Sequence, residues 1–260
     1  MTELPGYKIV EKITETTESI VYRSIRENEK KTFVIKMMKA KQLSSFERAS
    51  LKQHFDLIKS ADCPGVIKHI DILNTRDSYA WVLEDFNGVP LNRFLDGRPC
   101  KIKPFLEMAV QISEILGQLH QARIVHKDMK PPNILLNEGS GQIKISDFGI
   151  SSIISNEAGA SDDPGIITGT LFYMSPEQTG RMNRTVDYRT DLYSLGITFY
   201  EMLTGKVPFF STDPMEIIHS HMARKPVPPS EKSSNRCPPV ERELLAGSVH
   251  AFSFYLSGTF

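Results

Sequence analysis

The 260-residue sequence has few cysteines and no excess of charge of either sign. Its three cysteines, Cys63, Cys100 and Cys237, are far apart and form no CxxC pair. An odd number of widely spaced cysteines argues against a disulfide framework and against a zinc site. Basic and acidic residues are equal at 31 each, so the composition shows no electrostatic footprint for nucleic acid or an anionic membrane surface. We therefore expect a reducing, cytoplasmic setting and no nucleic-acid partner.

Long apolar stretches are also missing from the sequence. No uninterrupted apolar run approaches the length that crosses a bilayer, so we expect no membrane span. The first residues, Met1 to Pro5, lack the charged region and apolar run of a secretory signal. Hydrophobic residues still make up 40% of the chain, which is enough to bury a core. The composition thus favours a soluble protein or a soluble module of one.

Two polar segments concentrate the chemistry of the chain. Residues 126–133 have the sequence HKDMKPPN, and Asp147-Phe148-Gly149 follows after two short apolar runs joined by a polar turn, a pattern that predicts a β-hairpin. Within the first segment, Asp128 is followed two positions later by Lys130 and five positions later by Asn133. Phosphoryl transfer needs an acceptor for a hydroxyl proton and oxygen ligands for Mg²⁺, and these segments offer both.

These residues and their spacing resemble the catalytic loop and metal loop of the protein kinase family, of the Ser/Thr type. The resemblance implies an α+β fold with two lobes: a small lobe built on an antiparallel sheet (residues 1–86) and a mainly helical large lobe (87–230). It also implies ATP and Mg²⁺ as cofactors and a protein substrate. The final large-lobe helices have no matching segment, so residues 231–260 are interpreted as an atypical tail of a truncated or frame-altered chain.

The resemblance assigns a role to each polar residue of the two segments. Asp128 would accept the proton of the substrate hydroxyl, and Lys130 would contact the transferred phosphoryl group. Asn133 and Asp147 would be the Mg²⁺ ligands. Thr170 would bridge Asp128 and Lys130, as in kinases that act on Ser and Thr.

The nucleotide site implied by the resemblance lies mostly in the first 86 residues. Lys36, in the β-rich run Phe33-Val34-Ile35-Lys36, would reach the α- and β-phosphates. Since side chains alternate along a strand, Val34 shares its face and would contact adenine. The remaining adenine-pocket and hinge positions implied by the resemblance are Ile13, Val21, Leu83, Glu84, Phe86 and Leu135.

Two departures from the kinase pattern leave a second interpretation open. The first turn carries Thr14, Thr16 and Ser19 where the family has glycines, and these residues lack the freedom of glycine at positive φ. On the helix predicted over residues 43–60, the position of the family's lysine-pairing glutamate is His54. The alternative hypothesis is therefore a weak or inactive pseudokinase that binds nucleotide or partners and relays a signal.

Further elements follow from periodicity and from the resemblance. Strands are predicted over residues 7–10, 19–26 and 32–37, and helices over 103–121, 191–203 and 214–223, the last with Asp213 as N-cap. The apolar stripe of the helix over residues 43–60 is Phe46, Leu51, Phe55 and Ile58, and that of the helix over 103–121 includes Phe105, Leu106 and Ile112. Residues 150–167 resemble an activation segment. Ser161 within this segment and Thr168 directly after it are candidate phosphorylation sites. The run 178–196 resembles kinase-like modules of large bacterial multidomain sensor proteins, which implies attached sensor, ATPase or histidine-kinase modules. Asp191 is expected to bind the catalytic-loop backbone, and His126 to pack beneath Phe148.

Overall fold

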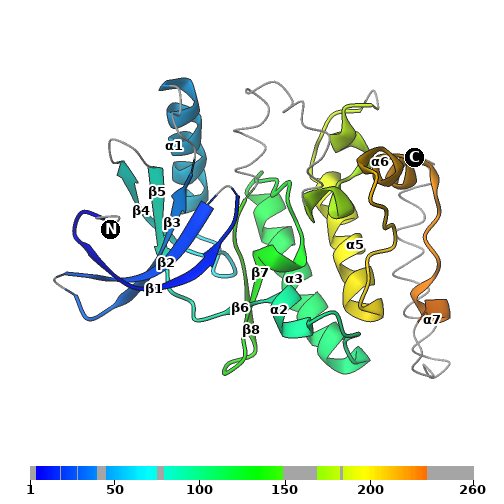
Figure 1. Cartoon of the computed structure of the whole chain (residues 1–260), viewed down its shortest axis with the longest axis horizontal. Helices are drawn as coiled ribbons and strands as arrows, with labels where there is room; N and C mark the ends of the chain where they lie inside the picture. The colour runs from blue at the N-terminus through cyan, green and yellow to red at the C-terminus, as the bar shows by residue number, and fades with distance from the viewer. Residues whose placement is uncertain are drawn as a thin grey trace. The chain divides into compact units, whose positions relative to one another are not determined.

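The computed structural model describes residues 4–17, 19–27, 29–39, 45–74, 79–148, 169–181 and 184–232. The chain divides into two compact units, residues 1–88 and 89–260, which are described separately below (Figure 1). Some sequence-based predictions lie outside the described residues. They concern Gly149, the segment 150–167 with Ser161, Thr168, and most of the tail, from residue 233 onward.

The first unit is built on a five-stranded sheet with the order β1-β2-β3-β5-β4 and antiparallel pairing throughout. Its strands are β1 (Tyr7–Glu15), β2 (Ser19–Arg26), β3 (Thr32–Met38), β4 (His69–Asn74) and β5 (Tyr79–Glu84). The first strand continues past the predicted end at Val10 to Glu15. It can do so because its pairing with β2 absorbs two irregularities, at Ile9/Glu11 and at Lys12/Thr14.

The two faces of this sheet carry different sets of side chains. Alternation on β3 places Phe33, Ile35 and Met37 in a core cluster with Ala80 and Val82 of β5. The intervening side chains of β3, Val34 and Lys36, are only partly buried and lie on the other face. The face opposite this cluster thus carries Lys36 together with apolar side chains such as Val34 and Leu83.

Helix α1 (Ser45–Ser60) contacts β4 in this unit. Leu51, Phe55 and Ile58 are buried, as the predicted apolar stripe requires. Phe46 was predicted to belong to that stripe, and this prediction is wrong because its side chain is 66% exposed. Phe46 and Leu51 differ by roughly 140° around the helix, so the two cannot share a narrow buried face.

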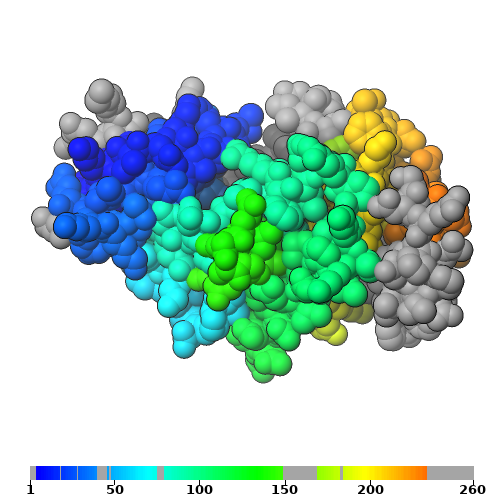
Figure 2. Space-filling model, turned by 90° about the horizontal axis from the view of Figure 1, so that it is seen from below, coloured from blue at the N-terminus to red at the C-terminus, as the bar shows by residue number. Residues whose placement is uncertain are grey.

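The second unit begins with β6 (Val89–Pro90), α2 (Leu91–Leu95) and α3 (Ile102–Gln121). The predicted hairpin is present as β7 (Ile134–Asn137) and β8 (Gln142–Ile145), and it forms a sheet of order β6-β7-β8. Figure 2 shows this hairpin in bright green at the surface of the unit, beside α3, which β8 contacts. On α3, Leu106 was predicted to be buried and is 40% exposed, whereas Met108 is buried, because the buried face runs through Phe105, Met108 and Ile112.

Helix α5 (Arg189–Thr204) runs through the interior of the second unit, with Tyr193, Ile197 and Tyr200 buried. Short 3₁₀ helices η1 (Pro131–Asn133), η2 (Gly169–Tyr173) and η3 (Pro176–Thr179) precede it in the chain, and α6 (Pro214–Ala223) and α7 (Pro229–Lys232) follow. The predicted N-cap of α6 is confirmed, since the Asp213 side chain accepts the Met215 N–H at 2.9 Å. Within the described part of the chain no helix has both the length and the apolar character to span a bilayer.

The end of α5 generates a stability prediction. Gly205 caps the helix at φ 73°, and a Cβ at this position would lie 2.5 Å from the carbonyl oxygen of Gly97. We expect Gly205→Ala to lower the free energy of unfolding by about 1 to 2 kcal/mol for the left-handed backbone and by about 1 to 3 kcal/mol more for the clash. Chemical denaturation measures the loss.

Gly97→Ala is the matched control. Gly97 also has a positive φ, 69°, but a Cβ there meets no atom within 4 Å, so only the backbone term should appear. Equal losses of unfolding free energy in the two variants would contradict the close packing of the α5 C-terminus on the backbone of Gly97.

Candidate functional site

The loop of residues 124–133 is attached to α5 by one buried carboxylate. Asp191, fully buried, accepts the backbone N–H of His126 at 2.8 Å and that of Lys127 at 2.7 Å. The Nε2 atom of His120 lies 2.9 Å from the same side chain. A buried charge needs such partners, and each donor here is also held in place by the charge. The expected hydrogen bonds from Asp191 to the loop backbone are therefore present.

His126 links this loop to the segment after β8. Its ring centroid lies 4.5 Å from that of Phe148, and its Nε2 atom lies 3.0 Å from the carbonyl oxygen of Ser146. The N–H of Asp128 donates to His126 Nδ1 at 3.2 Å. Because Nδ1 accepts, the ring proton is assigned to Nε2, which donates to Ser146. This neutral histidine fixes the backbone of both segments.

Four of the predicted catalytic residues lie together in the second unit. Lys130 Nζ lies 2.8 Å from Asp128 Oδ2 and donates to Thr170 Oγ1 at 2.7 Å. Asn133 Nδ2 donates to the carbonyl oxygen of Asp128 at 2.8 Å and to its Oδ2 at 2.9 Å. Thr170 was expected to bridge Asp128 and Lys130, and the described bonds place Lys130 between the other two. The carboxylate of Asp128 is thereby oriented by an ammonium group and an amide.

Asp147 lies on the segment that is tied to Asn133. Ser146, its neighbour, donates its backbone N–H to the carbonyl oxygen of Asn133 at 2.8 Å, and Asp147 itself has a positive φ of 62°. Among the described residues, no cluster of three or more His, Cys, Asp or Glu side chains could hold a metal. A carboxylate and an amide oxygen do suit Mg²⁺, which takes few protein ligands and shares its remaining positions with phosphate and water. The donor types of Asp147 and Asn133 therefore fit the implied cofactor.

The predicted nucleotide residues of the first unit gather on one sheet face. Lys36 lies opposite Val21 of β2 and Trp81 of β5, and Val34 lies opposite Leu83. Directly opposed residues share a face, so all of these side chains point the same way. The other predicted positions lie elsewhere: Ile13 at the second irregularity of β1, Glu84 at the end of β5, Phe86 in the segment after β5, and Leu135 on β7 of the second unit.

The turn between β1 and β2 is closed by a threonine side chain. Thr16 Oγ1 accepts the Ser19 N–H at 3.0 Å, and the Thr16 N–H donates to the carbonyl oxygen of Ser19 at 2.8 Å. The amide of Ser19, which a glycine-rich loop would offer to phosphate, thus already has an acceptor. Glu15, beside the turn, is paired with Lys39 and Lys12. The hydrogen bond from Lys39 has the largest effect on the Glu15 carboxyl group, followed by that from Lys12, and together they lower its pKa to about 2.

His54 lies on the sheet-facing side of α1. Its ring stacks beside that of Trp81, with the centroids 6.5 Å apart and the planes at 19°. Trp81 lies directly opposite Lys36 in the sheet. The residue at the predicted helix-glutamate position thus contributes an imidazole, and no carboxylate, next to the strand pair that carries Lys36.

Sequence reasoning missed the contacts that attach η2 and η3 to their surroundings. Tyr173 donates its hydroxyl to Glu201 Oε2 at 2.5 Å, and burial raises the pKa of both groups. Ser194 Oγ donates to the carbonyl oxygen of Tyr173 at 2.8 Å, and Gln178 Nε2 donates to that of Lys127 at 2.9 Å. The one available signal was a glutamate within the apolar sequence of α5. These bonds hold the segment of Thr170 next to the catalytic loop.

An antiparallel-sheet unit, together with a helical unit whose loop presents Asp128, Lys130 and Asn133, defines the protein kinase class. A model of the protein kinase domain matches residues 7–246, and the chain belongs to that family. The fold agrees: a solved structure of Rad53 residues 1–466 in complex with AMP-PNP has a TM-score of 0.73 at 21% identity, over 94% of this chain and 60% of that chain.

Serine/threonine-protein kinases are among the curated proteins that resemble this chain. Serine/threonine-protein kinase PknB of Mycolicibacterium smegmatis is 34% identical over 166 residues, which are 63% of this chain and 26% of the relative. The probable serine/threonine-protein kinase CPE1738 of Clostridium perfringens is 29% identical over 233 residues, 88% of this chain and 33% of the relative. The chain thus spans between a quarter and a third of the length of these relatives.

The packing behind η2 generates a pH prediction. His221 of α6 is buried, and its Nδ1 atom lies 2.8 Å from the Tyr193 hydroxyl. Burial lowers the pKa of His221 from 6.5 to about 4, an effect partly offset by the backbone of Leu171 and Phe172. Between these pH values the unfolded chain takes up a proton and the folded chain does not. We expect the free energy of unfolding to fall by up to about 3 kcal/mol as the pH drops through this range.

His221→Asn removes the titrating group and keeps an acceptor for Tyr193. In chemical denaturation at pH 7 and pH 4, this variant should lose less stability between the two pH values than the unmodified chain. His219→Asn, at an exposed position of the same helix, is the control and should retain the full loss. If the two variants had the same pH dependence, His221 would not be the group responsible.

Proposed function

We propose that this domain transfers the γ-phosphoryl group of ATP to a Ser or Thr hydroxyl of a protein substrate. The observation that carries the proposal is the position of Lys130, whose Nζ atom lies within 2.8 Å of Asp128 Oδ2 and donates to Thr170 Oγ1. This arrangement places a proton acceptor and a cation together in the loop that distinguishes the family. Membership of the protein kinase family and the serine/threonine kinases among its relatives support the choice of reaction and of substrate class.

In this proposal Asp128 binds the substrate hydroxyl and accepts its proton. Its carboxylate receives the amide N–H of Asn133 and the ammonium of Lys130, and both donors contact Oδ2 and orient the group. Lys130 would also contact the oxygens of the phosphoryl group in transfer. The protein then contributes by positioning the reactants and by stabilising charge, which is what phosphoryl transfer chiefly requires.

Nucleotide binding is assigned to residues of both units. Asn133 and Asp147 would hold Mg²⁺, which neutralises charge on the phosphates when it is bound. Lys36 would contact the α- and β-phosphates. Val21, Val34 and Leu83, which share its sheet face, would contact the adenine together with Ile13 and Leu135, while Glu84 and Phe86 belong to the segment that would hydrogen-bond the base.

A second function, nucleotide or partner binding without turnover, is favoured by two observations. The Ser19 amide in the β1–β2 turn is occupied by Thr16 Oγ1, so the turn offers fewer donors to phosphate than a glycine-rich loop does. The imidazole of His54 in place of a carboxylate favours the same function. The cluster around Asp128 favours catalysis, and we retain catalysis as the first proposal.

The setting of the domain is part of the same proposal. The balanced charge and scarce cysteines favour a cytoplasmic location. Attached sensor, ATPase or histidine-kinase modules are proposed from the sequence of residues 178–196 alone. The lobe boundaries after residues 86 and 230 and the atypical tail stay predictions.

Asp147→Asn tests the proposed catalysis. The substitution keeps the side-chain shape and removes the charge that would hold Mg²⁺, so we expect phosphotransfer to fall at least about 100-fold with little change in folding. Transfer of label from ATP to a generic protein substrate measures the rate. Asp96→Asn, at an exposed position of the same unit, should leave the rate unchanged.

A nucleotide-dependent thermal shift, measured beside the rate, separates the two functions. Turnover together with a shift would support the kinase, and a shift without turnover would support the binding module. Full activity in Asp147→Asn would discard the proposed metal ligand. The absence of both turnover and shift in the unmodified chain would overturn both functions.

A further inference from the structure

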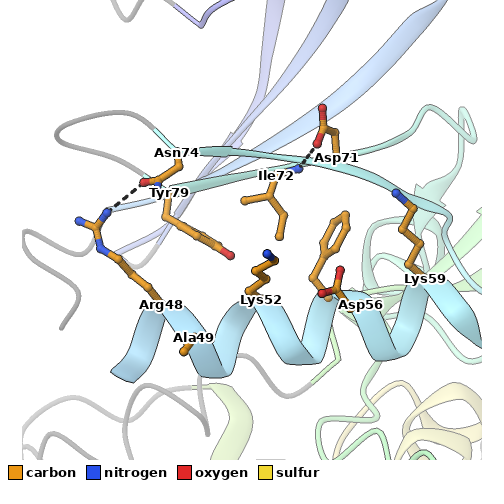
Figure 3. Close-up of a pocket in the computed structure, with 10 residues that line it drawn as sticks. Arg48, Ala49, Lys52, Asp56, Lys59, Asp71, Ile72, Asn74 and Tyr79 are labelled. Atoms are coloured by element: carbon orange, nitrogen blue, oxygen red, sulfur yellow. Dashed lines mark hydrogen bonds between the residues drawn. The ribbon is translucent and has the colours of Figure 1, made fainter. Parts of the chain in front are cut away.

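A cavity of about 510 Å³ lies within the first unit, between α1 and the strands β4 and β5. Arg48, Lys52 and Asp56 line it from successive turns of one face of α1. Figure 3 shows their side chains rising toward the strands, from which Ile72 and Tyr79 point back. None of these five residues belongs to the proposed nucleotide site. The volume is within the range of small-molecule sites, roughly 300 to 1,000 Å³.

The Tyr79 hydroxyl is a buried donor that faces this cavity. Tyr79 is only 6% exposed, and its hydroxyl oxygen makes no hydrogen bond within the described part of the chain. The indole N–H of Trp81, which lowers the pKa of Tyr79, lies outside hydrogen-bonding geometry, and burial raises that pKa more strongly. The hydroxyl therefore stays protonated. A buried polar group without a partner destabilises the fold, so an acceptor bound in the cavity would be favoured by the hydrogen bond that it completes.

Cations accompany this donor at one end of the cavity. Arg48 donates to Asn74 Oδ1 at 2.9 Å, a bond that holds its guanidinium at the wall. Lys52 is exposed and forms no ion pair among the described residues, and Figure 3 shows its amine and the Tyr79 hydroxyl directed into the same space. Three donor groups thus face this end of the cavity, two from α1 and one from β5. They suit a tetrahedral phosphate, which presents three acceptor oxygens.

The other end of the cavity has a different character. Lys59 is engaged with the carbonyl oxygen of Ile70 at 2.9 Å, and Asp71 accepts the backbone N–H of Ile72 at 2.8 Å. Asp56 adds a second carboxylate, which repels an anion but accepts hydrogen bonds from hydroxyl groups. A ligand that matches both ends therefore carries a phosphate and at least one hydroxyl group.

We propose that this cavity binds a small phosphorylated polyol, with its phosphate on Tyr79, Lys52 and Arg48 and a hydroxyl group on Asp56. The apolar floor formed by Phe55 and Ile72 would contact its carbon atoms. The proposal does not depend on phosphotransfer, because every residue that carries it lies in the first unit and outside the proposed catalytic cluster. The ligand would stabilise the position of α1, the helix that also carries His54.

Titration calorimetry of the whole chain with glycerol 3-phosphate, inorganic phosphate and glycerol tests the site. We expect saturable binding of glycerol 3-phosphate at one site, binding of inorganic phosphate about tenfold weaker, and no measurable binding of glycerol. Tyr79→Phe should weaken glycerol 3-phosphate binding about tenfold or more, because a hydrogen bond to a charged group is lost. Lys52→Gln should weaken it similarly, and Lys30→Gln, which removes an exposed charge elsewhere in the same unit, should not.

Two results would overturn the proposal. One is equal affinity in the unmodified chain, Tyr79→Phe and Lys52→Gln, and the other is the absence of saturable binding of glycerol 3-phosphate. Binding of a phosphoserine peptide without binding of glycerol 3-phosphate would assign the surface to protein docking and would also refute it. If Tyr79→Phe melts at a lower temperature than the unmodified chain, Lys52→Gln decides the test, since Lys52 is exposed and its loss leaves the core intact.

Discussion

The buried carboxylate of Asp191 is the interaction on which the arrangement of the catalytic loop depends. It receives two consecutive backbone amides of the loop, and Lys127, the second donor, has a φ of 66°. A non-glycine residue in the left-handed region is strained by an amount comparable to a hydrogen bond, so the loop needs an external partner to persist in this shape. Asp191, in the first turn of α5, is this partner. Its carboxylate is buried within the second unit and so is shielded from water. The positions of Asp128 and Asn133 follow from this attachment.

Around Asp191 the polar groups form a hydrogen-bond network, in which most side chains bind backbone atoms of neighbouring segments. His126 binds the carbonyl oxygen of Ser146, and Gln178 binds that of Lys127. Tyr173 and Glu201 add a buried pair of raised pKa that holds η2 on α5. Networks of this kind in a low-dielectric interior are rigid when every member is satisfied. The proposed chemistry would therefore depend on a frame whose geometry is set by these buried side chains.

Local sequence patterns predicted the helices and strands well. The predictions failed where burial depends on packing between residues far apart in the sequence. The hairpin of β7 and β8, the N-cap Asp213 and the strand runs followed from alternation and turn chemistry, which act between neighbours in sequence. Phe46 and Leu106 failed because the width of a buried stripe depends on what packs against it. In the candidate site, Asp128, Lys130 and Asn133 could be identified from their spacing in the sequence. The pairing of Tyr173 with Glu201 could not be predicted, because it joins residues 28 positions apart and leaves no local pattern. The hydroxyl closure of the β1–β2 turn by Thr16 was equally invisible, since it depends on backbone conformation.

The separation in sequence between Asp191 and its partners has a consequence for biosynthesis. The bonds to His126 and Lys127 span 65 and 64 positions, so the loop cannot adopt its final shape by local contacts. During translation, which proceeds from the N-terminus, α3 and the hairpin of β7 and β8 leave the ribosome well before α5 does. Until then the loop amides are open to water, and closing so long a segment is slow compared with forming the hairpin. The loop would accordingly take its final shape late, when α5 reaches the nascent helical unit.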